Sequence, residues 1–307
     1  MPQGPTIPIV VGLGELLWDC FADSRRPGGA PANVAFQAGQ LGCRGIVCSR
    51  VGDDADGDEL VAFLEQQGLT TEFVQRDGQL PTGRVTVDAS VPGSPQYVIH
   101  ENVAWDALRF DAATLWQQAD AVCFGSLAQR DVRSRETVHR CLQATRPACL
   151  RVFDANLRQE FYDRETIERS LQAAGVVKLN GDEATVLREL LALPTGDDRA
   201  FASSLRERFE VALVCITRGA EGCLLADGDD CVDLPGTEVN VVDAVGAGDA
   251  FTAALIDARL HGLTLQTTAE FANAVGGLVA TRSGAMPVLR DEFAALKQRF
   301  RSRSSSN

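Results

Sequence analysis

Apolar runs typical of buried strands alternate with helical segments along most of the chain, and this alternation constrains the fold more than any other feature. The strand-like runs include IPIVVGL, GIVCSRV, AVCFGS, RVFDA and ALVCIT. The segments between them carry helix signals, such as Pro31 at the start of PANVAFQAGQLG and Gly42 at its end. Continuous apolar strands separated by helices predict an α/β fold with a mostly parallel central sheet and helices on both faces.

One region does not suit a buried parallel sheet. Residues 83–101 alternate polar and apolar side chains in TGRVTVDAS and PQYVIHE, with VPGS between them. This pattern predicts a hairpin with one open face, and together with residues 15–25 it predicts a small antiparallel β lid. We therefore expect a single domain, residues 1–300, with the lid inserted in it and a disordered polar tail at 301–307.

The formal net charge of −13 narrows the class of partner. Such a charge repels a phosphate backbone, and no basic run offsets it, so we expect no nucleic-acid partner. No apolar run reaches the length of about eighteen residues that spans a membrane. The N-terminus lacks a basic start, and Glu15 interrupts its short apolar run, so we expect no signal peptide and a cytoplasmic protein.

The nine cysteines support the same compartment. No pair has the CxxC spacing of a zinc or redox site. Several lie in apolar strand-like runs, where a free cysteine behaves as a small hydrophobic side chain. We expect them to be reduced and structural.

The stretch VNVVDAVGAGDAFTAALIDARL, residues 239–260, contains the strongest chemical signal. Glycine-rich turns that open helices often bind phosphate. The P-loop of nucleotide triphosphatases needs a lysine that this stretch lacks. The dinucleotide fingerprint needs a third glycine where Phe251 stands, and the early GLGELL has Leu17 there. Both common phosphate loops are therefore excluded.

Another chemistry suits this stretch better. Consecutive N–H groups of residues 245–248 at a helix start would form an anion hole for phosphate oxygens. Asp249 would lie beside the transferred phosphoryl group, where it could take a proton from an attacking hydroxyl. The alternative is that Asp249 is only a first-turn acid favoured by the helix dipole.

Two segments carry a resemblance to a known family. DAVGAGDAF resembles the C-terminal signature of the ribokinase-like sugar kinases, the phosphofructokinase B family, usually written DTxGAGDxF, and GGAPANVAFQAGQLG resembles their N-terminal signature. The resemblance runs from about residue 10 to residue 289 and is greatest to bacterial fructokinases. It implies that Asp249 is the catalytic base and that the anion hole is formed by Gly246, Ala247 and Gly248. Ala244 stands where threonine is frequent in the family.

The resemblance also implies a sugar site. Asp19 resembles the sugar-binding aspartate of the family, and its oxygens could accept two hydroxyls. Asn33 lies in the N-terminal signature, although it could also be a surface amide on a helix. Arg158, in FDANLR, would neutralise the moving phosphoryl group or clamp an acidic substrate. The remaining residues assigned to the sugar are Gly28, Gly29, Arg84 and Asn102.

A nucleotide site follows from the same resemblance. Asn180 and Glu183 have the spacing of the family's NxxE motif, which would steer Mg²⁺ on the phosphates of ATP through water. The pair could also form a capping box, and the two interpretations are compatible. Asp243 resembles part of a monovalent-cation loop, and the need for K⁺ stays open. The residues assigned to the nucleotide itself are Thr217, Arg218, Gly219, Gly222 and Asn273.

The function implied is an ATP-dependent kinase for a primary hydroxyl of a sugar, with D-fructose favoured by Pro31 in the first signature. The alternatives are a 2-keto-3-deoxygluconate kinase, a ribokinase or a nucleoside kinase on the same fold, and a non-catalytic sugar-binding regulator. The intact Asp249 and glycine turn argue against the regulator. Whether the lid strands pair two copies into a homodimer is also open.

Overall fold

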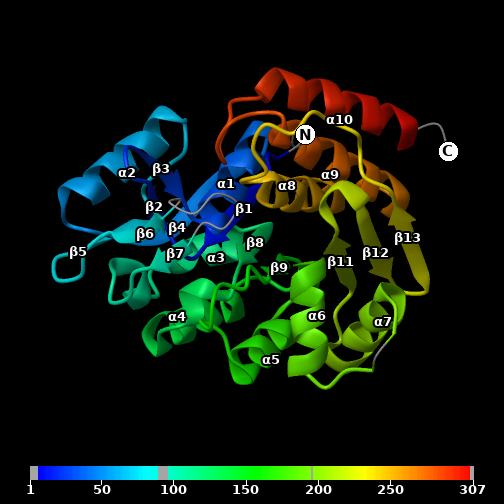
Figure 1. Ribbon diagram of the computed structural model, residues 1–307, viewed down its shortest axis with the longest axis horizontal. Coiled ribbons are helices and arrows are strands. Elements are labelled where there is room, and N and C mark those ends of the chain that lie inside the picture. The colour runs from blue at the N-terminus through cyan, green and yellow to red at the C-terminus, as the bar shows by residue number, and fades with distance from the viewer. Residues whose placement is uncertain (1–5, 89–95, 195, 305–307) are drawn as a thin grey trace, which may run out of the picture.

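Two β-sheets organise the chain in the computed structural model, which describes residues 6–88, 96–194 and 196–304 (Figure 1). The main sheet has nine strands, and its seven parallel members lie in the order β5, β4, β1, β8, β9, β10 and β11. The hairpin β12–β13 continues it in antiparallel fashion at one edge. In chain order these strands are β1 (Ile9–Leu13), β4 (Arg44–Gly52), β5 (Val74–Asp77), β8 (Ala121–Phe124), β9 (Leu150–Asp154), β10 (Val176–Asn180), β11 (Leu213–Thr217), β12 (Cys223–Asp227) and β13 (Asp230–Leu234).

Helices cover both faces of this sheet, as the alternation predicts (Figure 1). Val11 and Val122 on neighbouring strands pack toward the helices of one face, whereas Val10 and Cys123, one position away, pack toward the other. This two-sided burial explains why the strands are apolar at every position. One face carries α3 (Ala113–Gln118), α4 (Val132–Gln143), α5 (Arg164–Ala173), α6 (Gly181–Leu190) and α7 (Asp198–Phe209); the other carries α1 (Ala30–Gln40), α2 (Ala55–Gln66), α8 (Ala247–Leu260), α9 (Leu265–Ala280) and α10 (Arg290–Ser304).

The second sheet has four strands and matches the predicted lid in both of its segments. Its order is β3 (Arg25–Gly28), β2 (Leu17–Cys20), β6 (Gly83–Asp88) and β7 (Gln96–Ile99). The β2–β3 and β6–β7 pairings are antiparallel, as expected, whereas β2 and β6 pair in parallel. The connection between β6 and β7, residues 89–95, lies outside the described residues. We call this four-stranded sheet the lid sheet.

The predicted tail is shorter than expected, because α10 continues to Ser304. Residues 301–304 are therefore helical, and residues 305–307 lie outside the described residues. All nine cysteines are free and seven of them are buried, which confirms their structural interpretation. No helix in the described part of the chain combines the length and the hydropathy needed to cross a bilayer.

Candidate active site

A cavity of about 1590 Å³ lies at the carboxyl ends of the parallel strands, between the lid sheet and the start of α8. The lid sheet contributes an apolar wall of Leu17, Val85, Val87 and Ile99. The loops after β1 and β9 and the ends of β10 and β11 contribute polar groups, because the carboxyl ends of parallel strands meet at one edge of a sheet. Most of the residues predicted to bind sugar or nucleotide line this one cavity.

The glycine turn lies at the N-terminus of α8, as predicted. Gly246 has a φ of +79°, and a Cβ atom there would lie 2.6 Å from Ala285 Cα, so only glycine suits this position. Two of the four N–H groups predicted for the anion hole already have acceptors within the loop, since Val245 donates to Asp243 and Ala247 to the Ala244 carbonyl. Within the described residues, the N–H groups of Gly246 and Gly248 have no such acceptor. Two N–H groups, and not the four predicted, are therefore available to a phosphate oxygen.

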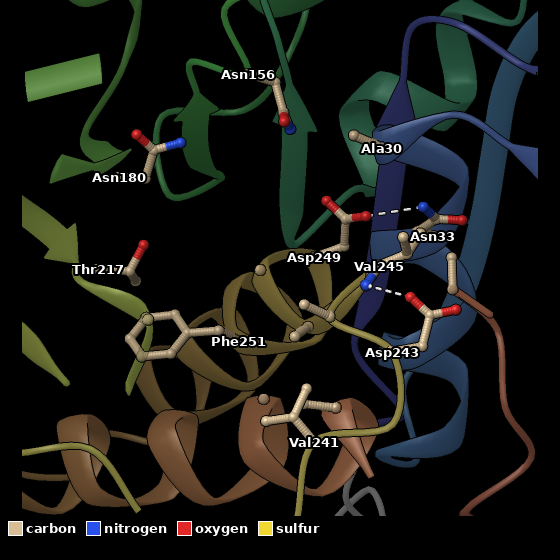
Figure 2. Close-up of a pocket in the computed structure, with 18 of the residues that line it drawn as sticks. Ala30, Asn33, Asn156, Asn180, Thr217, Val241, Asp243, Val245, Asp249 and Phe251 are labelled. Carbon is tan, nitrogen blue, oxygen red and sulfur yellow. Dashed lines mark hydrogen bonds between the residues drawn. The ribbon is translucent and has the colours of Figure 1, made fainter. Parts of the chain in front are cut away.

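Asp249 lies in the first turn of α8 and meets the N-terminal signature across the cavity. Asn33 Nδ2 donates to Asp249 Oδ2 at 2.8 Å, although 216 residues separate the two (Figure 2). Burial raises the pKa of Asp249 to about 6, the charge of Asp154 adds to the effect, and the Asn33 hydrogen bond opposes it. A carboxylate with a pKa near 6 is suited to accept a proton at neutral pH.

Asp19, on β2, faces the same cavity from the lid sheet. Burial raises its pKa to about 6, while the guanidinium groups of Arg158 and Arg26 oppose the rise. Gly28, on the paired strand β3, lies opposite Leu17, and a Cβ atom on Gly28 would lie 2.5 Å from Asp19 Oδ2. Gly28 thus makes room for the carboxylate, and Gly29, with φ of +118°, is the N-cap residue of α1.

Asn180 and Thr217, two of the predicted nucleotide residues, lie on the opposite side of the cavity from Asn33 (Figure 2). Asn180 ends β10 and Thr217 ends β11, in neighbouring positions of the parallel pairing. Gly222 has a φ of +93° and would meet the Leu234 carbonyl at 2.0 Å if it carried a Cβ atom. Gly219 and Asn273 complete this end of the wall.

Five of the predicted residues do not line the cavity. Glu183 is buried and forms a capping box with Asn180, while its other oxygen accepts from the Leu157 N–H. Arg218 pairs with Asp198 and Asp233, away from the cavity. The other three residues outside the wall are Gly28, which packs behind Asp19, Arg84, which pairs with Asp56, and Asn102, which is exposed.

A buried charge pair that was not predicted from the sequence lies behind the glycine turn. Lys178 Nζ lies 3.1 Å from Asp154 Oδ1, and both side chains are almost completely buried. Asp154 Oδ2 also accepts from Thr252 of α8 at 2.7 Å. Although burial opposes it, the carboxylates around Lys178 raise its pKa, so this cavity-lining amine stays protonated beside Gly248. The sequence feature that could have indicated this pair is the lysine within the apolar run VVKLN, residues 176–180.

Glu15 is a second cavity residue that was not predicted from the sequence. It is 4% exposed and lines the cavity, and burial raises its pKa, with the charge of Asp249 adding to the effect. Its Oε2 has no hydrogen-bond partner among the described residues. An unpartnered buried oxygen is costly, so Glu15 offers an acceptor for a donor from outside the chain.

The donor set suits Mg²⁺ carried by phosphates better than a metal held by the protein alone. No cluster of three or more His, Cys, Asp or Glu side chains in the described ranges could hold a metal ion. Mg²⁺ keeps several waters and usually needs only one or two protein ligands beside phosphates. Of the predicted Asn180 and Glu183 pair, Asn180 lines the cavity, and Glu183 holds Asn180 in place through the capping box. Asp243 is held by the N–H groups of Val245 and Gly284.

A glycine turn with two N–H groups that lack an acceptor, beside a carboxylate with a raised pKa, suits an enzyme that transfers a phosphoryl group to a hydroxyl. Residues 9–291 match the profile of the pfkB family carbohydrate kinase, and the chain belongs to this family.

Relatives and solved structures agree with this assignment. An uncharacterized sugar kinase of Pyrococcus horikoshii is 30% identical over 94% of this chain and 96% of the relative. Its crystal structure has a TM-score of 0.83 to this chain, with 29% identity over 94% of this chain and 97% of that one. A second structure of it, in complex with ATP, has a TM-score of 0.78, with 30% identity over 91% of this chain and 94% of that one.

Fructokinases are also similar to the chain. The fructokinase of Escherichia coli is 31% identical over 90% of this chain and 94% of the relative. A fructokinase structure from Vibrio cholerae with bound fructose, ADP and calcium ion has a TM-score of 0.79, with 25% identity over 94% of this chain and 99% of that one. The chain is thus a phosphotransferase of the sugar-kinase type.

Proposed function

We propose that this kinase transfers the terminal phosphoryl group of ATP to a primary hydroxyl of D-fructose, with Asp249 as general base. The hydrogen bond between Asn33 and Asp249 carries the proposal, because it joins the predicted sugar residue to the predicted base. Fructose as the sugar is supported by the similarity to fructokinases, and ATP by the ATP-bound relative.

The sugar end of the cavity suits a ligand with several hydroxyls. Asp19 and Glu15 offer carboxylate oxygens there, and Asn33 Oδ1 is a buried acceptor without a partner among the described residues. Hydroxyl donors satisfy such unpartnered acceptors. Because the guanidinium groups of Arg26 and Arg158 act on the same carboxylates, charge alone does not separate fructose from 2-keto-3-deoxygluconate, and the preference for fructose rests on these acceptors and on the similarity to fructokinases.

The proposed chemistry needs one proton transfer and one displacement. Asp249 takes the hydroxyl proton, the freed oxygen bonds to the terminal phosphorus, and the bond from that phosphorus to ADP breaks. Gly246 and Gly248 would donate to the phosphoryl oxygens, with the Lys178 ammonium and the Arg158 guanidinium near them. Mg²⁺, when bound with the nucleotide through Asn180, would neutralise charge on the phosphates.

A substrate panel tests this proposal. Fructose, ribose, adenosine and 2-keto-3-deoxygluconate are compared as acceptors for ATP, and we expect fructose to give the highest kcat/KM. If ribose or the keto-acid sugar exceeds fructose about tenfold, a difference of about 1.4 kcal/mol, the fructose assignment is wrong although the family assignment stands.

The Asp19→Ala variant tests the site within the same assay. We expect kcat/KM for the sugar to fall by about 2–4 kcal/mol, the usual order for removing a charged partner from a closed site. The Michaelis constant for ATP should change much less than that for the sugar, because Asp19 lies on the lid sheet, away from Thr217 and Asn180. A variant that weakens ATP and leaves the sugar untouched would show that the sugar end is misplaced.

A further inference from the structure

An ion pair connects the lid sheet to the loop that precedes α8. Arg26 Nη1, on β3, lies 3.1 Å from Asp243 Oδ2, although 217 residues separate the two. The same carboxylate group accepts from the Val245 N–H at 3.1 Å and from the Gly284 N–H at 3.0 Å. Arg26 therefore reaches the residue that orders the start of the glycine turn.

Arg26 is also next to the predicted sugar residue. Asp19 and Arg26 are directly opposite each other in the antiparallel β2–β3 pairing, and both line the cavity. The Arg26 guanidinium lies 5.5 Å from the centre of the Phe21 ring, another cavity-lining group. A ligand bound to Asp19 would fix β2, and with it the paired strand that carries Arg26.

We propose that Arg26 is a positioning residue that couples the two substrates, so that sugar held by the lid sheet strengthens nucleotide binding at the glycine turn. The coupling rests on the proposed function only in using Asp19 as the sugar residue. When the lid sheet is fixed, the Arg26–Asp243 pair restrains residues 243–246. A loop that is already ordered loses less conformational entropy when phosphate binds, and this difference is the coupling.

The neighbouring Arg25 provides a matched control. Successive residues of a strand point to opposite faces, and Arg25 pairs with Asp56 and Glu59 of α2 instead of with the cavity. It also lies over the Trp18 ring at 4.4 Å. Losing Arg25 removes the same charge from the same strand but leaves the Asp243 contact intact.

The test measures the dissociation constant of the non-hydrolysable analogue AMP-PNP with Mg²⁺ by calorimetry, with and without saturating sugar. The sugar is whichever panel member the wild-type enzyme phosphorylates. We expect sugar to tighten AMP-PNP binding about two- to fivefold in the wild type, the order for a half-exposed ion pair. Arg26→Gln should lose this effect, Arg25→Gln should keep it, and Arg26→Lys should restore part of it.

Salt provides a second readout that a merely structural role would not give. The Arg26 side chain is 48% exposed, so raised salt should screen the pair and reduce the coupling in the wild type but not in Arg26→Gln. The proposal is overturned if the wild type shows no coupling, or if Arg26→Gln keeps the wild-type ratio. Failure of fructose in the panel with coupling by another sugar would overturn the fructose assignment alone.

Discussion

Asp249 and Asp257 lie on the same helix, α8, and show how position decides what a carboxylate does. Asp249 faces the cavity, where its pKa is raised to about 6. Asp257 is 1% exposed and lies within 2.6 Å of Lys297 on α10. Asp249 is therefore available to a substrate, whereas Asp257 joins α8 to α10 through its ion pair with Lys297.

Asp249→Asn keeps the shape of the side chain and removes the proton acceptor. We expect kcat to fall about 10²- to 10⁴-fold, the usual contribution of a general base. Sugar binding, followed by calorimetry, should survive. A kcat within about threefold of the wild type would exclude Asp249 as the base, since general bases contribute more.

Asp257→Asn is the matched control on the same helix. Removing the charge from the buried pair with Lys297 should cost about 3 kcal/mol of stability and leave kcat nearly unchanged.

Asp249→Asn should not lower the melting temperature at neutral pH. Because the folded-state pKa of Asp249 is raised above 3.8, its ionisation weakens the fold as pH rises from about 4 to 6.

The pH dependence of kcat/KM tests both cavity carboxylates. Asp19 and Asp249 each have a pKa near 6; Asp249 must be ionised to accept a proton, and Asp19 binds hydroxyl donors more strongly when it is ionised. Below pH 6 both become protonated, so kcat/KM for the sugar should fall by up to about a hundredfold per pH unit. In Asp19→Asn only one group remains, and the fall should approach about tenfold per pH unit. Activity that is flat down to pH 5 would contradict the raised values.

At the scale of elements, the start of α8 depends on the conformation of its N-cap residue, Gly246. In Gly246→Ala, the new Cβ atom would meet Ala285 and the φ of +79° would be strained. The turn must move, so we expect kcat/KM for ATP to fall about a hundredfold, as when an anion-hole donor is lost. Steady-state kinetics with saturating sugar measure this change.

Gly262→Ala, after the C-terminus of the same helix, separates strain from function. Gly262 has a φ of +67°, but a Cβ atom there would have nothing within 4 Å. The variant should lose about 1–2 kcal/mol of stability through backbone strain and keep its kcat/KM for ATP. Equal kinetic losses in the two glycine variants would contradict a specific role for Gly246.

The elements were predictable from the sequence where one physical pattern dominates. Apolar strands and helix signals predicted the central parallel strands of the main sheet but not its edge strand β5, and the alternation in residues 83–101 predicted the lid hairpin. The β3 strand was not predicted as an element, because RRPG has no strand periodicity and is held by its pairing with β2. The parallel β2–β6 pairing depends on contacts between distant segments, which a local pattern does not contain.

The site was predictable to a similar extent. Two signatures located Asp249 and Asn33 at one cavity, because short motifs carry the glycine and carboxylate spacing. Lys178 and Glu15 were missed, since a charged residue within an apolar run has the same sequence pattern whether it reaches a cavity or a surface. The Arg26–Asp243 contact was also hidden, because only the fold brings β3 beside the loop before α8.

At the scale of the whole molecule, the cavity has two walls, one formed at the main sheet and the other by the lid sheet. The main sheet is packed on both faces by buried cores. The lid sheet turns Val85, Val87 and Ile99 toward the cavity and exposes Tyr97 and Val98 on β7 to about half of their full extent. Its edge strands, β3 and β7, each pair with one strand, whereas the central strands of the main sheet each pair with two. The lid sheet is therefore expected to open more readily than the main sheet.

This difference predicts that sugar closes the lid sheet. A bound sugar would contact Asp19 and the apolar wall, and closure would exclude the water that otherwise competes for the phosphoryl group. We expect hydrogen exchange, followed by mass spectrometry, to slow in β6 and β7 when the accepted sugar is added alone. The β12–β13 hairpin, at the far edge of the main sheet, is the internal control and should not change. Exchange in β6 and β7 that is the same with and without sugar would show that this sheet is a fixed wall and not a gate.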